Sequence, residues 1–192
     1  MDFEKLVGEA KEYIVELFSG NAGGHDAAHS LRVYHNAMTL ADAIPGCDRV
    51  VVALAALLHD ADDHKLFHTE NDANARGFLS RNGVPEAIID RICSAIDAVS
   101  FSRNRGRIPE TVEGKIVQDA DRLDAIGAVG IARTFAYGGE HGRSLEDSLN
   151  HFHEKLLLLK DEMNTSEALA LADERHAFLV RFLEQYEKET KE

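Results

Sequence analysis

Two adjacent residues, His59 and Asp60, end a long apolar stretch and are suited to metal chemistry. The stretch is VVVALAALL at residues 50–58, and two further acids follow at positions 62 and 63. An apolar run of this length predicts a helix buried on all sides, so the polar residues that end it start inside the protein. Buried polar groups are costly unless they are paired or bind a cation. A neutral imidazole beside a carboxylate suits a divalent ion of the Mn, Fe, Co, Ni or Zn type; the alternative is a buried His–Asp ion pair.

A polar stripe on the preceding helix offers a further ligand. We expect this helix to begin at His25 or Asp26, with Asp26 as its N-cap, and to end near residue 43. At about 100° per residue, four of its polar side chains fall within an arc of about 60°: His25, His29, Arg32 and Asn36. The stripe is either a solvent-exposed face or part of a site, in which case His29 is the candidate ligand.

The second cluster is QDADRLD at residues 118–124, on a helix expected from about residue 111. A calcium loop is excluded, because the cluster has no Gly at its sixth position and no Glu at its twelfth. On a helical wheel Asp121 lies on the same side as Gly114, Val117, Ala125 and Ala128, and small neighbours of this kind allow another helix to approach closely. We therefore expect Asp121 to be buried and to need a partner.

The elements that must position these residues make the chain all-α. Apolar residues recur at helical rather than alternating spacing, and there are only 3 Pro. The expected helices cover residues 2–18, 25–43, the apolar run from 50 up to a charged connection at 62–69, then 70–81, 85–99, from 111, 127–139, 145–163 and 165–189. In the last helix we expect these residues to face the core: Leu169, Leu171, Phe178, Phe182 and Leu183.

Composition limits the class of protein. A chain of 192 residues suits one domain, residues 1–192. The formal net charge of -13 disfavours a duplex nucleic-acid surface, but a small anionic substrate is compatible with it if a metal supplies local positive charge. Cys47 and Cys93 have no CxxC partner. No stretch resembles the apolar core of a secretory signal peptide, and none reaches membrane-spanning length. We expect a cytoplasmic protein with reduced thiols and no membrane partner.

One basic stretch interrupts this acidic chain. It is SFSRNRGRIP at residues 100–109, which contains three Arg and no acid. The stretch is either a solvated loop or a clamp for phosphate, since Arg binds phosphate oxygens in pairs of hydrogen bonds.

Taken together, the residues resemble a known pattern. His29, then His59 and Asp60, then Asp121, each on a different helix, resemble the H…HD…D signature of the HD-domain metal-dependent phosphohydrolases. The surrounding segments GHDAAHSLRV, ALLHDADD and QDADRLDAIGAVGIARTFAYGG are similar to small bacterial HD hydrolases that act on nucleotides. The resemblance covers about residues 20–180 and implies a single HD-domain helical bundle in which these four residues bind the metal.

The resemblance also implies the number of metals and the roles of nearby residues. It implies one divalent ion, with Mn first and Mg, Fe, Co, Ni or Zn as alternatives, because the helices at 70–81 and 85–99 lack the histidines of two-metal members. Asp63, four residues after His59 and near the same helix face, matches an acid that orients or deprotonates the attacking water. The candidates for holding phosphate are His25, Arg32, Lys65 and His68. Asp124 is either a substrate-orienting group or a solvated acid.

The activity implied is hydrolysis of a nucleotide. The bond is that of a nucleoside triphosphate, giving monophosphate and pyrophosphate, or that of a monophosphate, giving the nucleoside. Ala125 stands where members acting on stringent-response nucleotides have Asn, which disfavours those substrates. The alternative is a non-catalytic nucleotide-sensing or partner-binding module, and a homodimer is left open.

Overall fold

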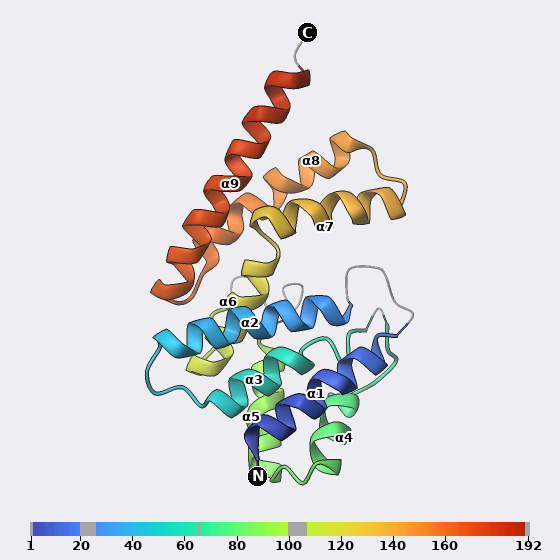
Figure 1. The fold of residues 1–192 in the computed structure, drawn as a ribbon, viewed down its shortest axis with the longest axis vertical. Helices are drawn as coiled ribbons and strands as arrows, with labels where there is room; N and C mark the ends of the chain where they lie inside the picture. Colours follow the sequence, from blue (N-terminus) through green and yellow to red (C-terminus); the bar gives the residue numbers. More distant parts are fainter. Residues whose placement is uncertain (1, 20–25, 65, 100–106, 191–192) are drawn as a thin grey trace. The chain divides into compact units, whose positions relative to one another are not determined.

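The computed structural model describes residues 2–19, 26–64, 66–99 and 107–190, which form helices joined by turns (Figure 1). No strand occurs within these ranges, which confirms the all-α prediction. The chain divides into two compact units, Met1–Asp121 and Arg122–Glu192. The boundary falls inside one helix, α6 (Val112–Asp124). One domain over residues 1–192 stays a prediction.

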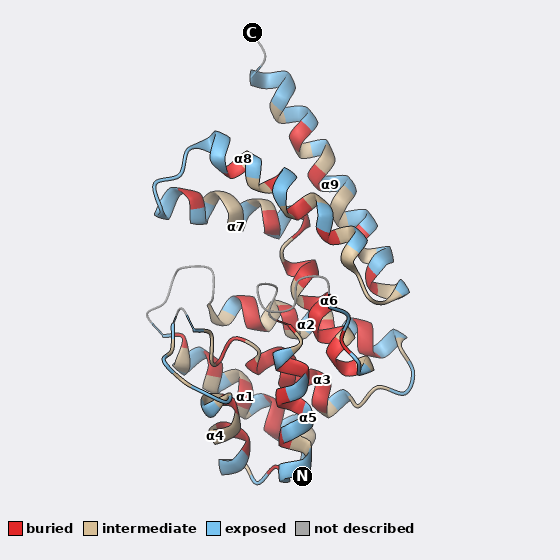
Figure 2. Ribbon diagram, turned by 180° about the vertical axis from the view of Figure 1, so that it is seen from behind, coloured by how far each residue is buried: buried red, intermediate tan, exposed pale blue. Residues whose placement is uncertain are grey.

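The central helix of the first unit is α3 (Arg49–Leu58). Every residue from 51 to 58 is at most 1% exposed, so this helix is buried on all sides, as the apolar run predicts (Figure 2). Each fully buried Leu in it contributes about 1.5 to 3 kcal/mol. The helices of this unit that pack against α3 are α1 (Phe3–Leu17), α2 (Ala27–Ala43) and α5 (Glu86–Asp97), and α4 (Ala73–Arg81) packs against α5.

The start of α3 is fixed by a charged cluster. Asp48 is its N-cap, and one carboxylate oxygen accepts hydrogen bonds from the backbone N–H groups of Val50 and Val51 at 3.1 and 3.4 Å. The other oxygen lies 2.8 Å from Nη1 of Arg91 on α5. The Asp48 N–H donates to the Glu113 carboxylate on α6 at 2.9 Å. The cluster therefore joins the starts of α3 and α6 to α5.

The middle of α6 lies close to the end of α5. The Gln118 side chain donates to the Ala98 carbonyl at 2.7 Å. At Gly114, a Cβ would lie 3.0 Å from Cβ of Pro109 and 3.6 Å from Cβ of Ala98. The small residues on this face of α6 therefore do permit a close approach, as expected from the helical wheel.

The second unit packs around aromatic rings. Its elements are α7 (Gly127–Glu140), α8 (Leu145–Glu154), the 3-10 helix η1 (Leu156–Glu162) and α9 (Ser166–Thr190). The rings of Phe135, Phe152 and Phe182 have centroids 5.9 Å apart in all three pairs, which suits aromatic packing. None of the described helices, α9 included, is both long enough and apolar enough to cross a membrane.

Two expectations for this unit are wrong. The helix expected over 145–163 is interrupted at Lys155, whose backbone has φ -138° and ψ -59°, and its second half is the 3-10 helix η1. In α9, Leu169 and Phe178 are 41% and 44% exposed. The reason is that the buried stripe follows other positions of the helical period: Ala168, Ala172, Leu179 and Leu183. Of the five residues expected in the core, Leu183 alone lies on that stripe, while Phe182 belongs to the aromatic cluster.

Candidate metal centre

His29 is placed by the first turn of α2. Asp26 is the N-cap of this helix, as expected, and its carboxylate accepts a hydrogen bond from the His29 N–H at 2.7 Å. Substituting such a cap usually costs about 0.5 to 2 kcal/mol, so the turn is well defined. The His29 residue is only 3% exposed. The polar stripe of α2 is therefore not a purely solvent-exposed face.

His59 and Asp60 lie just beyond the last residue of α3. His59 is the C-cap, with φ -58° and ψ -30°, and its side chain is 2% exposed. Its Nδ1 lies 2.9 Å from the Ala56 carbonyl oxygen. Because a carbonyl only accepts, Nδ1 carries a proton, and the neutral ring then has its lone pair on Nε2. A carbonyl bonded to the outer nitrogen is the usual way in which a metal-binding histidine is oriented.

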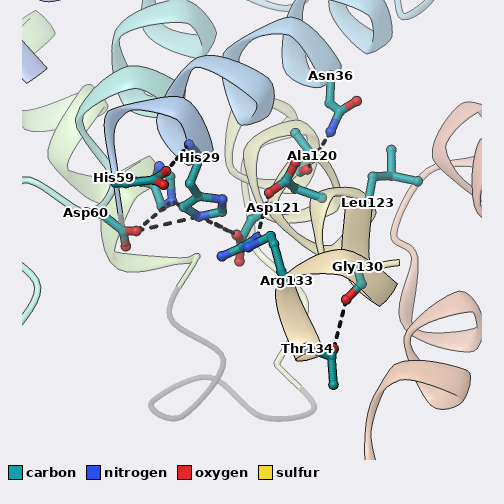
Figure 3. A network of polar contacts seen from close by, with 12 residues as sticks. His29, Asn36, His59, Asp60, Ala120, Asp121, Leu123, Gly130, Arg133 and Thr134 are labelled. Carbon is teal, nitrogen blue, oxygen red and sulfur yellow. Dashed lines mark hydrogen bonds and ion pairs between the residues drawn. The ribbon is translucent and has the colours of Figure 1, made fainter. Parts of the chain in front are cut away.

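The side chains of the four predicted ligands converge (Figure 3). Nε2 of His29 lies 3.2 Å from Nε2 of His59. Oδ2 of Asp60 lies 3.5 Å from both of these nitrogens. Oδ1 of Asp121 lies 3.3 Å from the His29 nitrogen and 4.0 Å from the His59 nitrogen. Side chains from α2, the end of α3 and α6 therefore direct their donor atoms at one point.

This arrangement fits a divalent cation. Ligands about 2.0 to 2.2 Å from a common ion lie roughly 3 to 4 Å from one another, which matches the observed separations. The donor atoms of His29, His59 and Asp121 all lie within 4.8 Å of one another, and Asp60 joins the group through both histidines. Two imidazole nitrogens that face each other between two carboxylates are not explained by a simple His59–Asp60 ion pair. A cation held by His29, His59 and Asp121 would satisfy these three groups, and Asp60 lies 3.5 Å from both histidine nitrogens.

The electrostatics of Asp121 agree with a charged ligand. Burial raises the pKa of its carboxyl, but the hydrogen bond with His29 and the electrostatic attraction of the His29 and His59 rings lower it by more, so the pKa lies below its ordinary value. The side chain is 29% exposed, so the expectation of a buried residue is wrong in degree. The acids that α6 does bury are Glu113, Asp119 and Asp124. Asp121 is the most exposed of the four candidate ligand side chains.

Asp63 follows the candidate ligand Asp60 by three residues. The expectation that it shares a helix face with His59 is wrong, because α3 ends before His59. Turns hold it instead: its N–H donates to the Asp60 carbonyl at 3.1 Å, and its own carbonyl accepts from the N–H groups of Leu66 and Phe67 at 2.9 and 2.8 Å. The residue is half-buried. Its assignment as the acid that acts on water stays a prediction.

The other predicted substrate residues are placed unevenly. Arg32 is half-buried on α2, and His68 is exposed after the turns that follow α3. His25, Lys65 and residues 100–106 of the basic stretch lie outside the described residues. Arg107, at the end of that stretch, is exposed. Phosphate binding by these predicted residues and by the basic stretch stays a prediction.

Asp124 is not a solvated acid. Its side chain is 3% exposed, and its carboxylate lies 2.6 Å from Nη1 of Arg133. A second arginine of the same unit, Arg175, donates to the Leu123 carbonyl at 2.6 Å. Arg175 also covers Gly127, whose φ of +73° favours glycine and whose added Cβ would lie 3.2 Å from the Arg175 Cβ. The end of α6 is thus held by two arginines that no sequence motif indicated.

The cysteines take no part in the centre. Both are free. Burial raises the pKa of the Cys93 thiol to about 12, so it stays protonated at neutral pH and is a poor metal ligand. The donor set of the centre consists of nitrogen and oxygen.

A family model described as "HD domain" matches residues 26–126, more than half of the chain, and spans all four converging residues. The chain belongs to the HD domain family. This confirms the resemblance seen in the H…HD…D residues. The cluster of His29, His59 and Asp121, which could hold a metal ion, lies within the matched residues.

Similar proteins extend this likeness over the full chain. The protein YpgQ of Bacillus subtilis is 40% identical over 96% of this chain and 94% of its own length. A crystal structure of YpgQ matches with a TM-score of 0.86 at 36% identity, covering 98% of this chain and 97% of that one. YpgQ has also been crystallised in complex with ADP, and that structure matches with a TM-score of 0.83 at 34% identity, covering the same shares. An HD-superfamily hydrolase of Bacillus thuringiensis matches with a TM-score of 0.80 at 38% identity, covering 97% of both chains. The chain therefore has the fold of the bacterial HD-superfamily hydrolases.

Two features of the centre were missing from the sequence-based prediction. One is the Ala56 carbonyl, which orients His59. The sequence could have indicated it, because Ala56 precedes His59 by three residues at the end of a helix, where backbone carbonyls lack helical partners. The other is Asp62, whose two oxygens accept hydrogen bonds from the N–H groups of Asn74 and Ala75 at 2.9 and 3.0 Å. Asp62 is therefore a structural acid beside Asp60 and Asp63.

Proposed function

We propose that the protein is a metal-dependent phosphohydrolase that acts on nucleotides. The reaction is cleavage of a nucleoside triphosphate to the monophosphate and pyrophosphate, or of a monophosphate to the nucleoside. The metal is one divalent ion per chain, with Mn²⁺ the first choice. The ligands are His29, His59, Asp60 and Asp121.

The observation that carries the proposal is the convergence of these four side chains. The two imidazole nitrogens lie 3.2 Å apart, and each lies 3.5 Å from the same oxygen of Asp60. Such a set of two neutral nitrogens and two carboxylates leaves positions on a divalent ion open for other ligands. A bound ion of this kind lowers the pKa of water and polarises a phosphoryl group.

The residues around the centre have separate roles. Asp63, held half-buried by the turn that begins at Asp60, orients or deprotonates the attacking water. Arg32 supplies positive charge for phosphate from the same helix as His29. His25, Lys65, His68 and Asp124 remain candidates for contacts with the substrate. In a chain of net charge -13, local cations of this kind matter for attracting an anion.

A nucleotide substrate is supported by the relative YpgQ, which has been crystallised with ADP. That protein resembles this chain over nearly its full length. ADP contains both a base and a diphosphate, so a related pocket in this protein would accept a nucleoside phosphate.

The alternative is a module that binds nucleotide without turnover. Loss of activity in such a protein usually begins with a missing ligand. Here all four donor groups and Asp63 are present, which favours the enzyme.

A panel of nucleotides tests the two accounts. The protein loaded with Mn²⁺ is incubated with nucleoside tri-, di- and monophosphates, and phosphate and pyrophosphate are measured separately. His59→Ala, which removes a central ligand, is the control for contaminating phosphatases. We expect metal-dependent release of one product from one substrate class, and none from the control.

Nucleotide binding without any release would contradict the proposal. The absence of product release must hold with each of Mn, Mg, Co, Ni and Fe, and nucleotide binding must be measured by calorimetry on the same samples. The sensing module would then be the better account of the same residues.

A further inference from the structure

One residue of the polar stripe on α2 has no part in the ligand set or in the proposed phosphate contacts. Asn36 follows His29 by seven residues, two helical turns, so both lie near one face of α2. Its side-chain N–H donates to the Ala120 carbonyl of α6 at 3.2 Å (Figure 3). Ala120 directly precedes Asp121. The helix that carries one ligand is thus hydrogen-bonded to the backbone next to another.

The place of this bond within α6 matters. The helix ends at Asp124, so Asp121 lies in its last turn, and Arg133 and Arg175 bond Asp124 and Leu123 at the far end of that turn. Two further side-chain bonds lie earlier in α6: Glu113 meets Asp48 at the start, and Gln118 meets Ala98 in the middle. The Asn36 bond is made at the residue directly before Asp121.

The distances across the centre leave little tolerance. Oδ1 of Asp121 lies 3.3 Å from Nε2 of His29, and a displacement of the last turn by a fraction of an ångström takes the carboxylate out of reach of a shared ion. His29 is fixed independently, by the Asp26 cap and by its burial. The distance between α2 and the end of α6 therefore bears directly on the separation of His29 and Asp121.

We propose that Asn36 is a positioning residue of the metal centre, which sets the separation of His29 and Asp121 through its hydrogen bond to the Ala120 carbonyl. The inference rests on the proposed metal site but not on the substrate. Removing a residue that orients ligands in this way typically weakens metal affinity by about 10 to 100-fold. Asn36 does not touch the ion, so its effect passes through the position of Asp121.

The chain offers a matched control in Gln118. Its side-chain amide also donates to a backbone carbonyl, and it also ties α6 to a neighbouring helix, with a donor–acceptor distance of 2.7 Å. The partner, Ala98, caps α5, which carries none of the four ligands. Asn36→Leu and Gln118→Leu therefore each remove one hydrogen bond from a side-chain amide to a backbone carbonyl, and each of these bonds joins α6 to a neighbouring helix.

The test measures metal affinity without any substrate. Mn²⁺ dissociation constants of the parent, Asn36→Leu and Gln118→Leu are measured by competition with a chelator, and Co²⁺ absorption spectra report the ligand geometry. We expect Asn36→Leu to weaken Mn²⁺ binding by about 10 to 100-fold and to change the Co²⁺ spectrum. Gln118→Leu should leave both within about threefold of the parent, even where the two variants lose similar thermal stability.

Two results would overturn the inference in distinguishable ways. Equal Mn²⁺ affinity in Asn36→Leu and the parent removes the positioning role and leaves the proposed function standing. Equal weakening in both variants means that any loosening of α6 has the same effect, so Asn36 has no special part. A parent protein without Mn²⁺ affinity overturns the metal centre itself, and the inference with it.

Discussion

The two nitrogens of His59 have different tasks, and this difference decides what the centre can bind. Nδ1 donates to the Ala56 carbonyl, so Nε2 faces His29 and Asp60 with its lone pair. An imidazolium in this place would present a proton to the cation instead of a lone pair. Metal binding therefore requires the neutral ring, and acid weakens it.

The first residue-scale prediction concerns Asp63. As a group that acts on water rather than on the ion, it contributes in the transition state and little in the ground state. Asp63→Asn keeps the size and removes the charge. We expect retained metal, nearly unchanged nucleotide binding and a fall in kcat of roughly 10² to 10⁴-fold. Metal analysis, calorimetry and steady-state kinetics measure the three quantities.

Loss of metal in Asp63→Asn would make Asp63 a ligand and the four-residue set wrong. Unchanged kcat would leave the ion alone to activate water. Asp62 is excluded as a substitute by its structural hydrogen bonds to the start of α4.

At the scale of elements, the start of α4 depends on an acid from outside the helix. Its N-cap residue, Asp72, is in the left-handed conformation with φ 53° and makes no side-chain cap bond. Asp62 supplies the missing acceptors through Asn74 and Ala75, and the Asn74 side chain donates back to the Ala61 carbonyl at 2.8 Å. The segment that follows the centre is thereby tied to the next helix.

This arrangement predicts that Asp62 and Asp63 have opposite phenotypes. Asp62→Ala should lower the free energy of unfolding by about 1 to 2 kcal/mol, the usual cost of a lost N-cap, while metal content stays at one per chain. Asp62→Asn, which keeps one acceptor, should lose less. Urea unfolding and elemental analysis measure both quantities. Full stability in Asp62→Ala would show that water replaces the cap, and loss of metal would give Asp62 a role in the centre.

The sequence predicted which segments form helices better than it predicted where each helix ends. The buried α3, the Asp26 cap and the all-α class follow from hydrophobic period and local capping, which are properties of short segments. The end of α3 at Leu58 does not follow, because the turns after it depend on backbone bonds such as that from Asp63 to Asp60. In α9, the apolar residues outnumber the positions that its neighbours cover, so Leu169 and Phe178 remain exposed.

The convergence of the candidate ligands could be expected from residue types, and the contacts around them could not. His29, His59, Asp60 and Asp121 are recognisable from residue chemistry and order in the chain. Two contacts are made to backbone carbonyls: that of Ala56, which lies against His59, is indicated only by its place at a helix end, and that of Ala120, which accepts from Asn36, has no signal in the residue types. Arg133, the partner of Asp124, was missed for a related reason: a charge pair nine residues apart across a turn has no periodic signal.

At the scale of the whole molecule, the metal centre belongs to one of two compact units. All four candidate ligands lie within residues 1–121, while residues 122–192 have an aromatic core of their own. The boundary nevertheless falls inside α6, directly after Asp121. If the second unit unfolds, the last turn of α6 loses the bonds of Arg133 and Arg175. We therefore propose that the two units unfold together as one domain.

The final prediction tests this coupling by calorimetry. We expect one thermal transition, with equal calorimetric and van't Hoff enthalpies. Mn²⁺ at a hundred times its Kd should stabilise the folded state by about 2.7 kcal/mol. For a protein of this size that corresponds to a rise in Tm of about 5 to 11 °C. In Asp121→Asn, which removes the charge of a ligand, the same Mn²⁺ concentration should move Tm much less. Two transitions, of which Mn²⁺ moves only one, would instead show that residues 1–121 and 122–192 are separate domains and that the ion stabilises the first alone.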